Sequence, residues 1–384
     1  MIFSNKYIEY SSKSKVELYK ILILFKILSN QKIVFCGKVL LNIALKLHLP
    51  ILSLIKKTVF QQFCGGENIE ESKAKIVELG QYNIQTILDY SIEGKNDENS
   101  FNDTYHEIIK TLEEAENNPL IPFCVFKITG FGRIGLLKKV NENTKLSLIE
   151  KKEFEVIKMR LQNICRRAQE KKIPILIDAE ESWIQNTIDT LAENLMKTYN
   201  KSEVIVYNTI QLYRWDKLEY IKKLHGKSKK ENYKLGFKLV RGAYMEKERI
   251  RAKLKKYICP IHKNKTNCDH DYDEASRYCI DNVQDMALCF GTHNEKSTEM
   301  IIKLMKAKSI PHNDKRIYFS QLLGMSDNIS FYLGKFKYNV AKYVPYGPVK
   351  EVLPYLIRRA EENSAITGQT NREIIRIQEL IKNY

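Results

Sequence analysis

From about residue 80 onward, short apolar runs alternate with longer stretches whose apolar residues recur at helical spacing. The short runs have the length of strands, and the longer stretches have the length of amphipathic helices. Eight strands are predicted, at 85–91, 123–129, 173–178, 204–211, 236–241, 286–292, 316–322 and 340–345. The clearest helices are predicted at 147–171, 184–200, 295–308 and 349–363.

Strand–helix alternation repeated eight times favours parallel strands closed into a (β/α)8 barrel. The alternative is an open, doubly wound sheet, which usually carries the pattern Gly-x-Gly-x-x-Gly after its first strand. The first predicted strand is followed instead by Ile-Glu-Gly-Lys at 92–95. We therefore predict an α/β fold, a TIM-like barrel that occupies residues 76–384.

A helical region at residues 1–75 is predicted to precede the barrel. Apolar residues recur at helical spacing at 16–28 and 39–56, and Pro50 is expected to kink or split the second helix. Polar residues and Pro50 interrupt this region before the ~20 apolar residues that a membrane-spanning helix needs. The first residues also lack the charged start, apolar core and cleavage site of a secretory signal.

The chain is basic, with 63 Lys and Arg against 46 Asp and Glu and a net charge of +17. Such a charge raises nucleic acid or an anionic membrane as partners. The lysines are scattered among Ile- and Asn-rich segments and form no single stripe, so no nucleic-acid partner is expected. The 8 cysteines lie far apart, which is typical of free thiols in a reducing compartment. We expect a cytoplasmic location, with peripheral contact to the inner face of the cytoplasmic membrane as an accessory property.

Polar side chains recur where the predicted strands end, which is where the chemistry of a barrel gathers. They are Asp89, Lys127, Asp178, Gln211, Lys238, Arg241, Thr292, His293, Gln321 and Tyr343. Buried parallel strands otherwise prefer apolar residues. The most informative run is Lys-Leu-Val-Arg-Gly-Ala-Tyr at 238–244, where a cation and then a glycine allow the backbone to approach a ligand closely. These residues predict a site for a polar, roughly planar ligand and a small charged one.

The chain resembles the proline dehydrogenases, and is most similar to the monofunctional ones. The resemblance rests on motifs such as Ile-Asp-Ala-Glu-Glu-Ser-Trp at 177–183 and Tyr-Leu-Ile-Arg-Arg-Ala-Glu-Glu-Asn at 355–363. Further matching segments lie at 63–68, 88–95, 127–130, 209–213, 238–249, 291–295, 321–327 and 343–349. Together they cover about residues 58–375 in the order of the family.

The resemblance implies a distorted barrel that binds FAD non-covalently and oxidises L-proline to Δ1-pyrroline-5-carboxylate, the first step of proline catabolism to glutamate. Electrons would pass to a membrane quinone, and a separate pyrroline-5-carboxylate dehydrogenase would perform the next oxidation. Asp178 and Lys238 match positions usually assigned as active-site residues. The substrate-binding positions are matched by Lys127, Tyr244, Leu322, Tyr343, Arg358 and Arg359. The flavin-binding positions are matched by Ala179, Gln211, Arg241, Gly242, Ala243, Thr292 and His293.

The chemistry of these residue types is consistent with the implied roles. Arg358 and Arg359 offer planar donors suited to the carboxylate of proline, although adjacent helical residues point about 100° apart and at least one could be a surface charge. Asp178 ends an apolar run, so its charge needs a partner, and Lys127 is the expected one. At position 238 the bifunctional bacterial branch usually has Arg, whereas this chain has a lysine, which keeps the charge but loses the planar fork.

Two other kinds of function remain open. A zinc-stabilised module is suggested by Cys259, His262, Cys268 and His270, which have the ligand types and close spacing of a zinc site. A basic membrane-surface protein without catalysis is suggested by the charge and the N-terminal helices. Another flavin barrel, such as a folate reductase, is not favoured, because the paired arginines and Tyr343 match the proline dehydrogenases. We predict no metal among the site groups.

Overall fold

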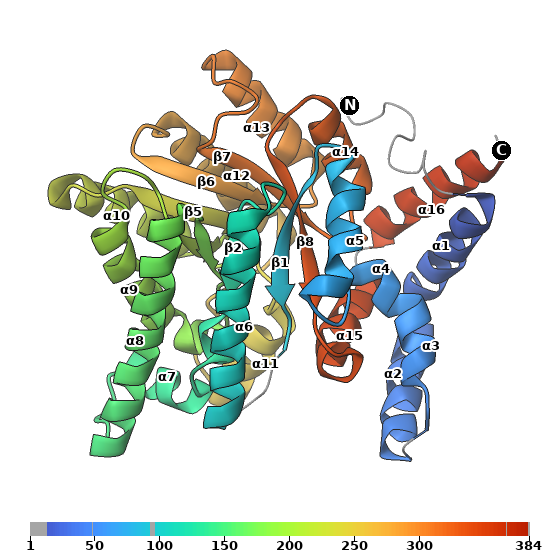
Figure 1. The fold of residues 1–384 in the computed structure, drawn as a ribbon, viewed down its shortest axis with the longest axis horizontal. Helices are drawn as coiled ribbons and strands as arrows, with labels where there is room; N and C mark the ends of the chain where they lie inside the picture. The colour runs from blue at the N-terminus through green and yellow to red at the C-terminus, as the bar shows by residue number, and fades with distance from the viewer. Residues whose placement is uncertain (1–13, 48, 93–96, 366, 383–384) are drawn as a thin grey trace.

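The predicted barrel is present (Figure 1). The computed structural model describes residues 14–47, 49–92, 97–365 and 367–382. Within these residues, 8 parallel strands form one sheet in the order β1-β8-β7-β6-β5-β4-β3-β2. The strands are β1 (Gln85–Tyr90), β2 (Cys124–Phe126), β3 (Ile175–Ile177), β4 (Val206–Gln211), β5 (Leu235–Val240), β6 (Met286–Gly291), β7 (Ile317–Leu322) and β8 (Val340–Tyr346).

The two strands at the ends of this order, β1 and β2, lie side by side and close the barrel. The Thr86 N–H of β1 donates to the Leu120 carbonyl oxygen, 2.7 Å away, in the segment that leads into β2. Because all the strands run in the same direction, their C-terminal residues meet at one rim.

Helices cover the outside of the barrel and bury the outer faces of the strands (Figure 1). The helices between and after the strands are α6 (Glu98–Asn117), α7 (Ile134–Asn141), α8 (Leu148–Lys171), α9 (Ser182–Tyr199), α10 (Lys217–Glu231), α11 (Met245–Lys255), α12 (Lys265–Asp281), α13 (Glu295–Ala307), α14 (Asp327–Lys335), α15 (Val349–Ala365) and α16 (Thr367–Lys382). Local chemistry fixes where they begin. At α8, the Ser147 hydroxyl accepts from the Glu150 N–H while the Glu150 carboxylate accepts from the Ser147 N–H.

The N-terminal region is helical, as predicted, and packs against α15 and α16. Its elements are α1 (Lys15–Leu28), α2 (Gln31–Lys46), α3 (Leu52–Ile55), a π-helix (Lys56–Phe60), α4 (Gln61–Phe63) and α5 (Ile69–Gly80). α1 lies along α16 and α2 along α15 (Figure 1). The Lys38 Nζ of α2 lies 2.7 Å from the Glu361 Oε1 of α15.

The predicted helix at 39–56 had the wrong bounds. α2 already begins at Gln31, because the Asn30 side chain accepts hydrogen bonds from the N–H groups of Lys32 and Ile33. It ends at Lys46. The helical segment is interrupted around Pro50, as expected, and α3 begins at Leu52. The predicted boundary between residues 75 and 76 falls inside α5, and the division of the chain at that point stays a prediction.

The interior of the barrel contains an apolar layer to which most strands contribute. It includes Ile87, Val125, Leu176, Tyr207, Ala287 and Ala341. Residues two positions apart on a strand face the same side, so the next inward-facing residues toward the rim are two positions later. These are Asp89, Lys127, Asp178, Thr209, Cys289 and Tyr343. Lys238 joins this layer, because it aligns with Thr209 of β4 and with Cys289 of β6.

Candidate active site

Four polar side chains meet at this layer, two from within β5 and β8 and two from the residues that directly follow β2 and β3. The Lys238 Nζ pairs with the Asp178 Oδ1 and also donates to the Tyr343 hydroxyl oxygen, 2.6 Å away. The Tyr343 hydroxyl lies 3.4 Å from the same Asp178 oxygen. The Lys127 Nζ lies 3.8 Å from the Asp178 Oδ2. The expected pairing of Asp178 with Lys127 is therefore present, and Lys238 and Tyr343 complete the group, which we call the Asp178 cluster.

Burial controls the chemistry of the Asp178 cluster. Tyr343 and Lys238 are both buried. Burial raises the pKa of Tyr343 well above its ordinary value, and the nearby Asp178 charge raises the pKa further. The hydroxyl therefore stays protonated at neutral pH. The Lys238 Nζ also lies 4.4 Å from the centre of the Tyr343 ring, within the range of a cation–π contact.

Most of the predicted flavin-binding residues are brought together at the ends of β3 to β6. The Arg241 Nη1 donates to the Thr292 Oγ1 at 2.8 Å. The Ala243 N–H donates to the Gln211 Oε1 at 3.4 Å, and the Gln211 Nε2 donates to the carbonyl oxygen of Glu180 at 2.7 Å. Ala179 immediately precedes Glu180 and is buried. These contacts link the ends of four neighbouring strands.

Gly242 allows the backbone to turn closely over a ring at this point. Its φ is +138°, a conformation that other residues rarely adopt, and an added Cβ would lie 2.5 Å from ring atoms of Tyr213. The buried Thr209 Oγ1, on the inward layer, makes no hydrogen bond within the described part of the chain. The buried hydroxyl without a partner and the polar side chains gathered at the ends of these four strands fit a polar cofactor such as FAD.

His293 lies among cations. Burial, together with the positive charges of Lys342, Arg359 and Arg241, lowers its pKa to about 3. Its Nδ1 lies 3.1 Å from the Ser326 Oγ. The imidazole is therefore neutral at neutral pH. Two of the three cations also face carboxylates, since Arg241 pairs with Asp269 and Lys342 pairs with Asp327.

The two adjacent arginines lie on α15, near the end of the barrel toward which the strands point (Figure 1). Arg359 is buried, and its guanidinium lies 5.1 Å from the centre of the Tyr355 ring. Arg358 is half-buried. Neither is a fully exposed charge, and Arg359 is close enough to act electrostatically on His293.

Leu322 and Tyr244, the two remaining residues predicted to bind the substrate, lie in different parts of the barrel rim. Leu322 ends β7 and aligns with Tyr343 in the parallel register, so it lies beside the Asp178 cluster. Tyr244 is half-buried and immediately precedes α11, with its ring 5.4 Å from the Lys247 Nζ.

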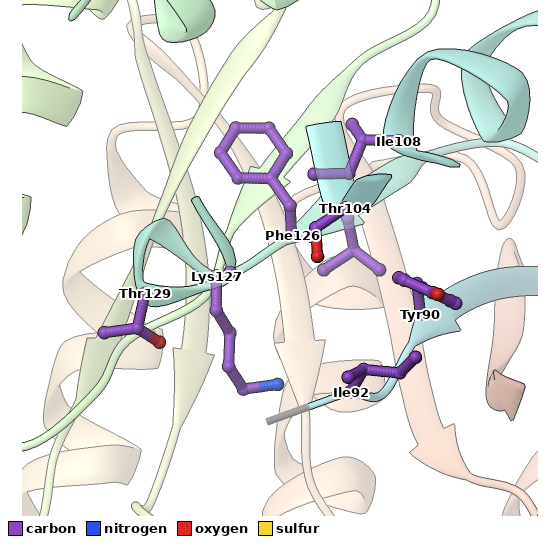
Figure 2. A pocket seen from close by; sticks show the side chains of 9 residues that line it. Tyr90, Ile92, Thr104, Ile108, Phe126, Lys127 and Thr129 are labelled. Atoms are coloured by element: carbon purple, nitrogen blue, oxygen red, sulfur yellow. The ribbon is translucent and has the colours of Figure 1, made fainter. Parts of the chain in front are cut away.

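A small cavity borders Lys127 (Figure 2). Its volume is about 20 Å³, and Tyr90, Thr104, Phe126 and Thr129 are among the residues that line it. This is room for about one water molecule, so the cavity is not by itself a site for an amino acid.

Two buried ionisable residues that adjoin the predicted site residues Tyr343 and Ala179 were not singled out from the sequence. Lys342 of β8 is fully buried; its Nζ donates to the Met325 carbonyl oxygen at 2.6 Å and lies 2.6 Å from the Asp327 Oδ1. Glu180 is buried directly after Ala179, and burial raises its pKa to about 7. A lysine within the apolar strand Val340–Tyr346 is a signal that could have identified the first, because a buried charge needs partners.

The two histidines that suggested zinc both contact Asp271. The His262 Nε2 lies 2.7 Å from the Asp271 Oδ2, and the His270 Nδ1 lies 3.2 Å from the Asp271 Oδ1. In the described ranges, no three His, Cys, Asp or Glu residues are placed to hold a metal ion. The zinc interpretation is therefore not favoured.

The sequence profile of the proline dehydrogenase family matches residues 72–372. The chain belongs to this family. It is 32% identical to proline dehydrogenase 1, mitochondrial, of Dictyostelium discoideum, over 97% of this chain and 73% of that protein. It is 28% identical to hydroxyproline dehydrogenase of Xenopus laevis, over 94% of this chain and 85% of that protein.

The fold also matches solved structures. The crystal structure of proline utilization A from Bdellovibrio bacteriovorus superposes with a TM-score of 0.73 at 20% identity, over 93% of this chain. The chain spans 38% of the length of that protein. Members of the proline dehydrogenase family are oxidoreductases of proline catabolism, so the resemblance found in the motifs is confirmed at the level of the whole chain.

Proposed function

We propose that this protein is an FAD-dependent proline dehydrogenase that oxidises L-proline to Δ1-pyrroline-5-carboxylate and passes the electrons to a quinone. The observation that carries the proposal is the Asp178 cluster, which lies beside the linked candidate flavin residues at the same rim of the barrel. Family membership supports the substrate class.

The reaction removes a hydride from the ring carbon bonded to nitrogen and a proton from the nitrogen, which leaves a C=N bond. Bound FAD would accept the hydride. The nitrogen lone pair must be free, so a proton has to leave the amine near the reacting carbon. We assign its handling to the Asp178 cluster, whose carboxylate faces two ammonium groups.

The other residues bind and orient. Arg359 and Arg358 offer guanidinium donors for the carboxylate of proline. Gln211 has both a donor and an acceptor for the pyrimidine edge of a flavin. Arg241 and Lys238 supply positive charge that would stabilise the anionic reduced ring.

The absorption spectrum of the purified protein tests the proposal. We expect a flavin spectrum that bleaches when L-proline is added anaerobically, and no reduction of NAD. A colourless protein that binds no added FAD and reduces NAD with proline would overturn the proposal.

A basic and apolar surface on the N-terminal helices supports contact with a membrane, where the quinone lies. Between Glu17 and Glu67 the chain has no acidic residue but contains Lys20, Lys26, Lys32, Lys38, Lys46, Lys56 and Lys57. In the same segment Phe35, Leu40, Leu47 and Leu54 are each more than 60% exposed. Large exposed apolar side chains among lysines fit an anionic bilayer surface. Among the described residues, no helix has the length and apolar content needed to cross a bilayer.

Vesicle sedimentation tests this contact. We expect binding to vesicles that contain phosphatidylglycerol, weaker binding to neutral vesicles, and loss of binding in a Phe35→Ser/Leu40→Ser variant. The matched control is Leu148→Ser/Ile149→Ser, which changes two equally exposed apolar residues at the start of α8. Equal loss in both variants would contradict a specific surface. The quinone, a separate pyrroline-5-carboxylate dehydrogenase and a cytoplasmic location remain further parts of the proposal.

A further inference from the structure

The ends of three neighbouring strands are joined through one buried residue, Glu180. Its Oε1 accepts from the Thr129 N–H at 3.2 Å, and its Oε2 accepts a short bond from the Thr129 hydroxyl. Its own carbonyl oxygen accepts from the Gln211 Nε2 at 2.7 Å. Thr129 follows β2, Glu180 follows β3, and Gln211 ends β4.

Thr129 lies in the turn that presents Lys127. The turn is a single 3-10 helix, Ile128–Gly130, and Lys127 is the residue that precedes it. A short turn of this kind has few internal hydrogen bonds to hold its conformation. A carboxylate that binds both the N–H and the hydroxyl of Thr129 therefore restricts where the Lys127 side chain begins.

We propose that Glu180 is a positioning residue, whose side chain fixes the turn that carries Lys127 and whose backbone fixes Gln211. The inference rests on the proposed function, which assigns Lys127 to the substrate and Gln211 to the flavin. Glu180 itself does not touch the reacting atoms in this account. It sets the separation between a substrate-binding group and a cofactor-binding group.

A buried polar network holds Glu180 from behind. The Glu180 N–H donates to the Gln185 Oε1 at 2.7 Å, and the Gln185 Nε2 donates to the Asp189 Oδ1 at 2.8 Å. Asp189 in turn pairs with the Lys217 Nζ at the start of α10. All four residues are buried. Because buried polar groups are costly unless every partner is present, this network favours one position for the segment after β3.

The kinetics of the holoenzyme provide the first test. Glu180→Ala removes both acceptors, and we expect the KM for proline to rise by at least about tenfold, with a larger effect on KM than on kcat. Glu180→Gln keeps the shape; its amide oxygen can accept from the Thr129 N–H while its amide nitrogen donates to the Thr129 hydroxyl. We expect this variant to recover most of the loss. The matched control is Glu181→Gln, because Glu181 pairs with Lys247 on α11 and not with the turn.

Hydrogen exchange provides a readout that needs neither cofactor nor turnover. In protein without FAD, the Thr129 amide should exchange faster in Glu180→Ala than in the unmutated protein, and Glu180→Gln should restore its protection. Unchanged exchange in Glu180→Ala would overturn the inference, as would faster exchange with unchanged proline KM. If Glu180→Ala does not fold, Thr129→Val decides, since it removes only the hydroxyl; an unchanged KM in that variant also overturns the inference. An unmutated protein that neither binds FAD nor oxidises proline would overturn the proposed function instead, while the exchange result would still stand.

Discussion

Burial separates the two adjacent arginines of α15. Arg359 is buried and acts on His293, whereas Arg358 is half-buried. We expect Arg359→Met to raise the proline KM by about one to three orders of magnitude, because a charge-assisted hydrogen bond is worth roughly 1.5–3 kcal/mol and more when its partner is left buried. Arg358→Met should also raise KM, by a smaller factor. Flavin content should fall less than proline affinity.

Steady-state kinetics and the absorbance ratio of flavin to protein measure both effects. Arg277→Met is a suitable control, because Arg277 lies on the exposed side of α12 beside Glu274. Unchanged proline kinetics in both α15 variants would assign the pair to packing and not to substrate binding.

Tyr343 predicts the choice between proline and 4-hydroxyproline as substrate. The resemblance to the family implies that proline-preferring members have tyrosine at this position and hydroxyproline-preferring members a smaller residue. Its ring would crowd the hydroxyl-bearing carbon of 4-hydroxyproline, a misfit typically worth about 1–3 kcal/mol. We expect proline to be favoured over trans-4-hydroxyproline by at least roughly tenfold in kcat/KM.

The hydroxyl and the ring of Tyr343 can be separated. Tyr343→Ser should narrow the preference mainly by harming proline, whereas Tyr343→Phe keeps the ring and loses the contact with Lys238. Tyr343→Phe should therefore lower activity while it keeps the preference. Equal kcat/KM for both substrates in the unmutated enzyme would mean that Tyr343 does not wall the pocket.

A single lysine of β8, Lys342, holds the segment that follows β7. The Lys342 Nζ binds the Leu322 and Met325 carbonyl oxygens and the Asp327 carboxylate, so it joins Leu322 to the start of α14. Lys342→Met leaves these acceptors without their donor. Loss of one partner from a buried pair costs about 3–5 kcal/mol. We expect a large fall in the free energy of unfolding, measured with urea, and a raised proline KM because Leu322 moves.

A comparison variant separates the two effects. Lys335→Met removes a cation at the other end of α14, where lysine completes the last turn and does not enter the barrel. If Lys335→Met lowers stability as much as Lys342→Met does, α14 itself is sensitive to substitution, and the contacts of Lys342 are not the cause.

The elements were predictable because their signals are local. Predicted strands such as 286–292 and 316–322 lie within a residue of β6 and β7, since these apolar runs have the length of a strand and are too short for a helix. β2 is shorter than predicted, because the turn that follows Lys127 interrupts it. The motifs singled out Asp178 and Lys238, whose side chains meet in the Asp178 cluster, and their role in the reaction stays a prediction.

Apart from the pairing of Asp178 with Lys127, the contacts between segments were not predictable from local patterns. Glu180 meets Thr129 across a separation of 51 residues, and Tyr343 meets Lys238 across 105. No periodicity encodes these distances along the chain. A carboxyl in the segment that follows a buried strand was visible at Glu180, but only the closed barrel shows which turn it holds.

At the scale of the whole molecule, buried ionisable groups make stability depend on pH in opposite directions. Glu180 has a raised pKa, so its contribution to stability is present at low pH and is lost as the pH rises from the ordinary value of 4.5 through about 7. His293 has a lowered pKa of about 3 against an ordinary 6.5. Below pH 6.5 the unfolded chain takes up a proton at His293 that the folded protein does not. Stability from His293 is therefore full above pH 6.5 and falls as the pH drops toward 3.

Replacing His293 isolates its contribution to the pH dependence of the free energy of unfolding. His293→Gln retains a donor and an acceptor for Ser326, and it leaves Glu180 to act equally in both proteins. Between pH 7.5 and pH 5, the unmutated protein should lose about 2 kcal/mol more unfolding free energy than His293→Gln. Below pH 6.5, each pH unit changes the free energy of unfolding by about 1.4 kcal/mol for each proton that only the unfolded chain binds. Urea unfolding at both pH values measures this double difference. The same acid-induced loss in the unmutated protein and in His293→Gln would mean that His293 takes up its proton in the folded state, and that the cations around it are neutralised by an anionic group.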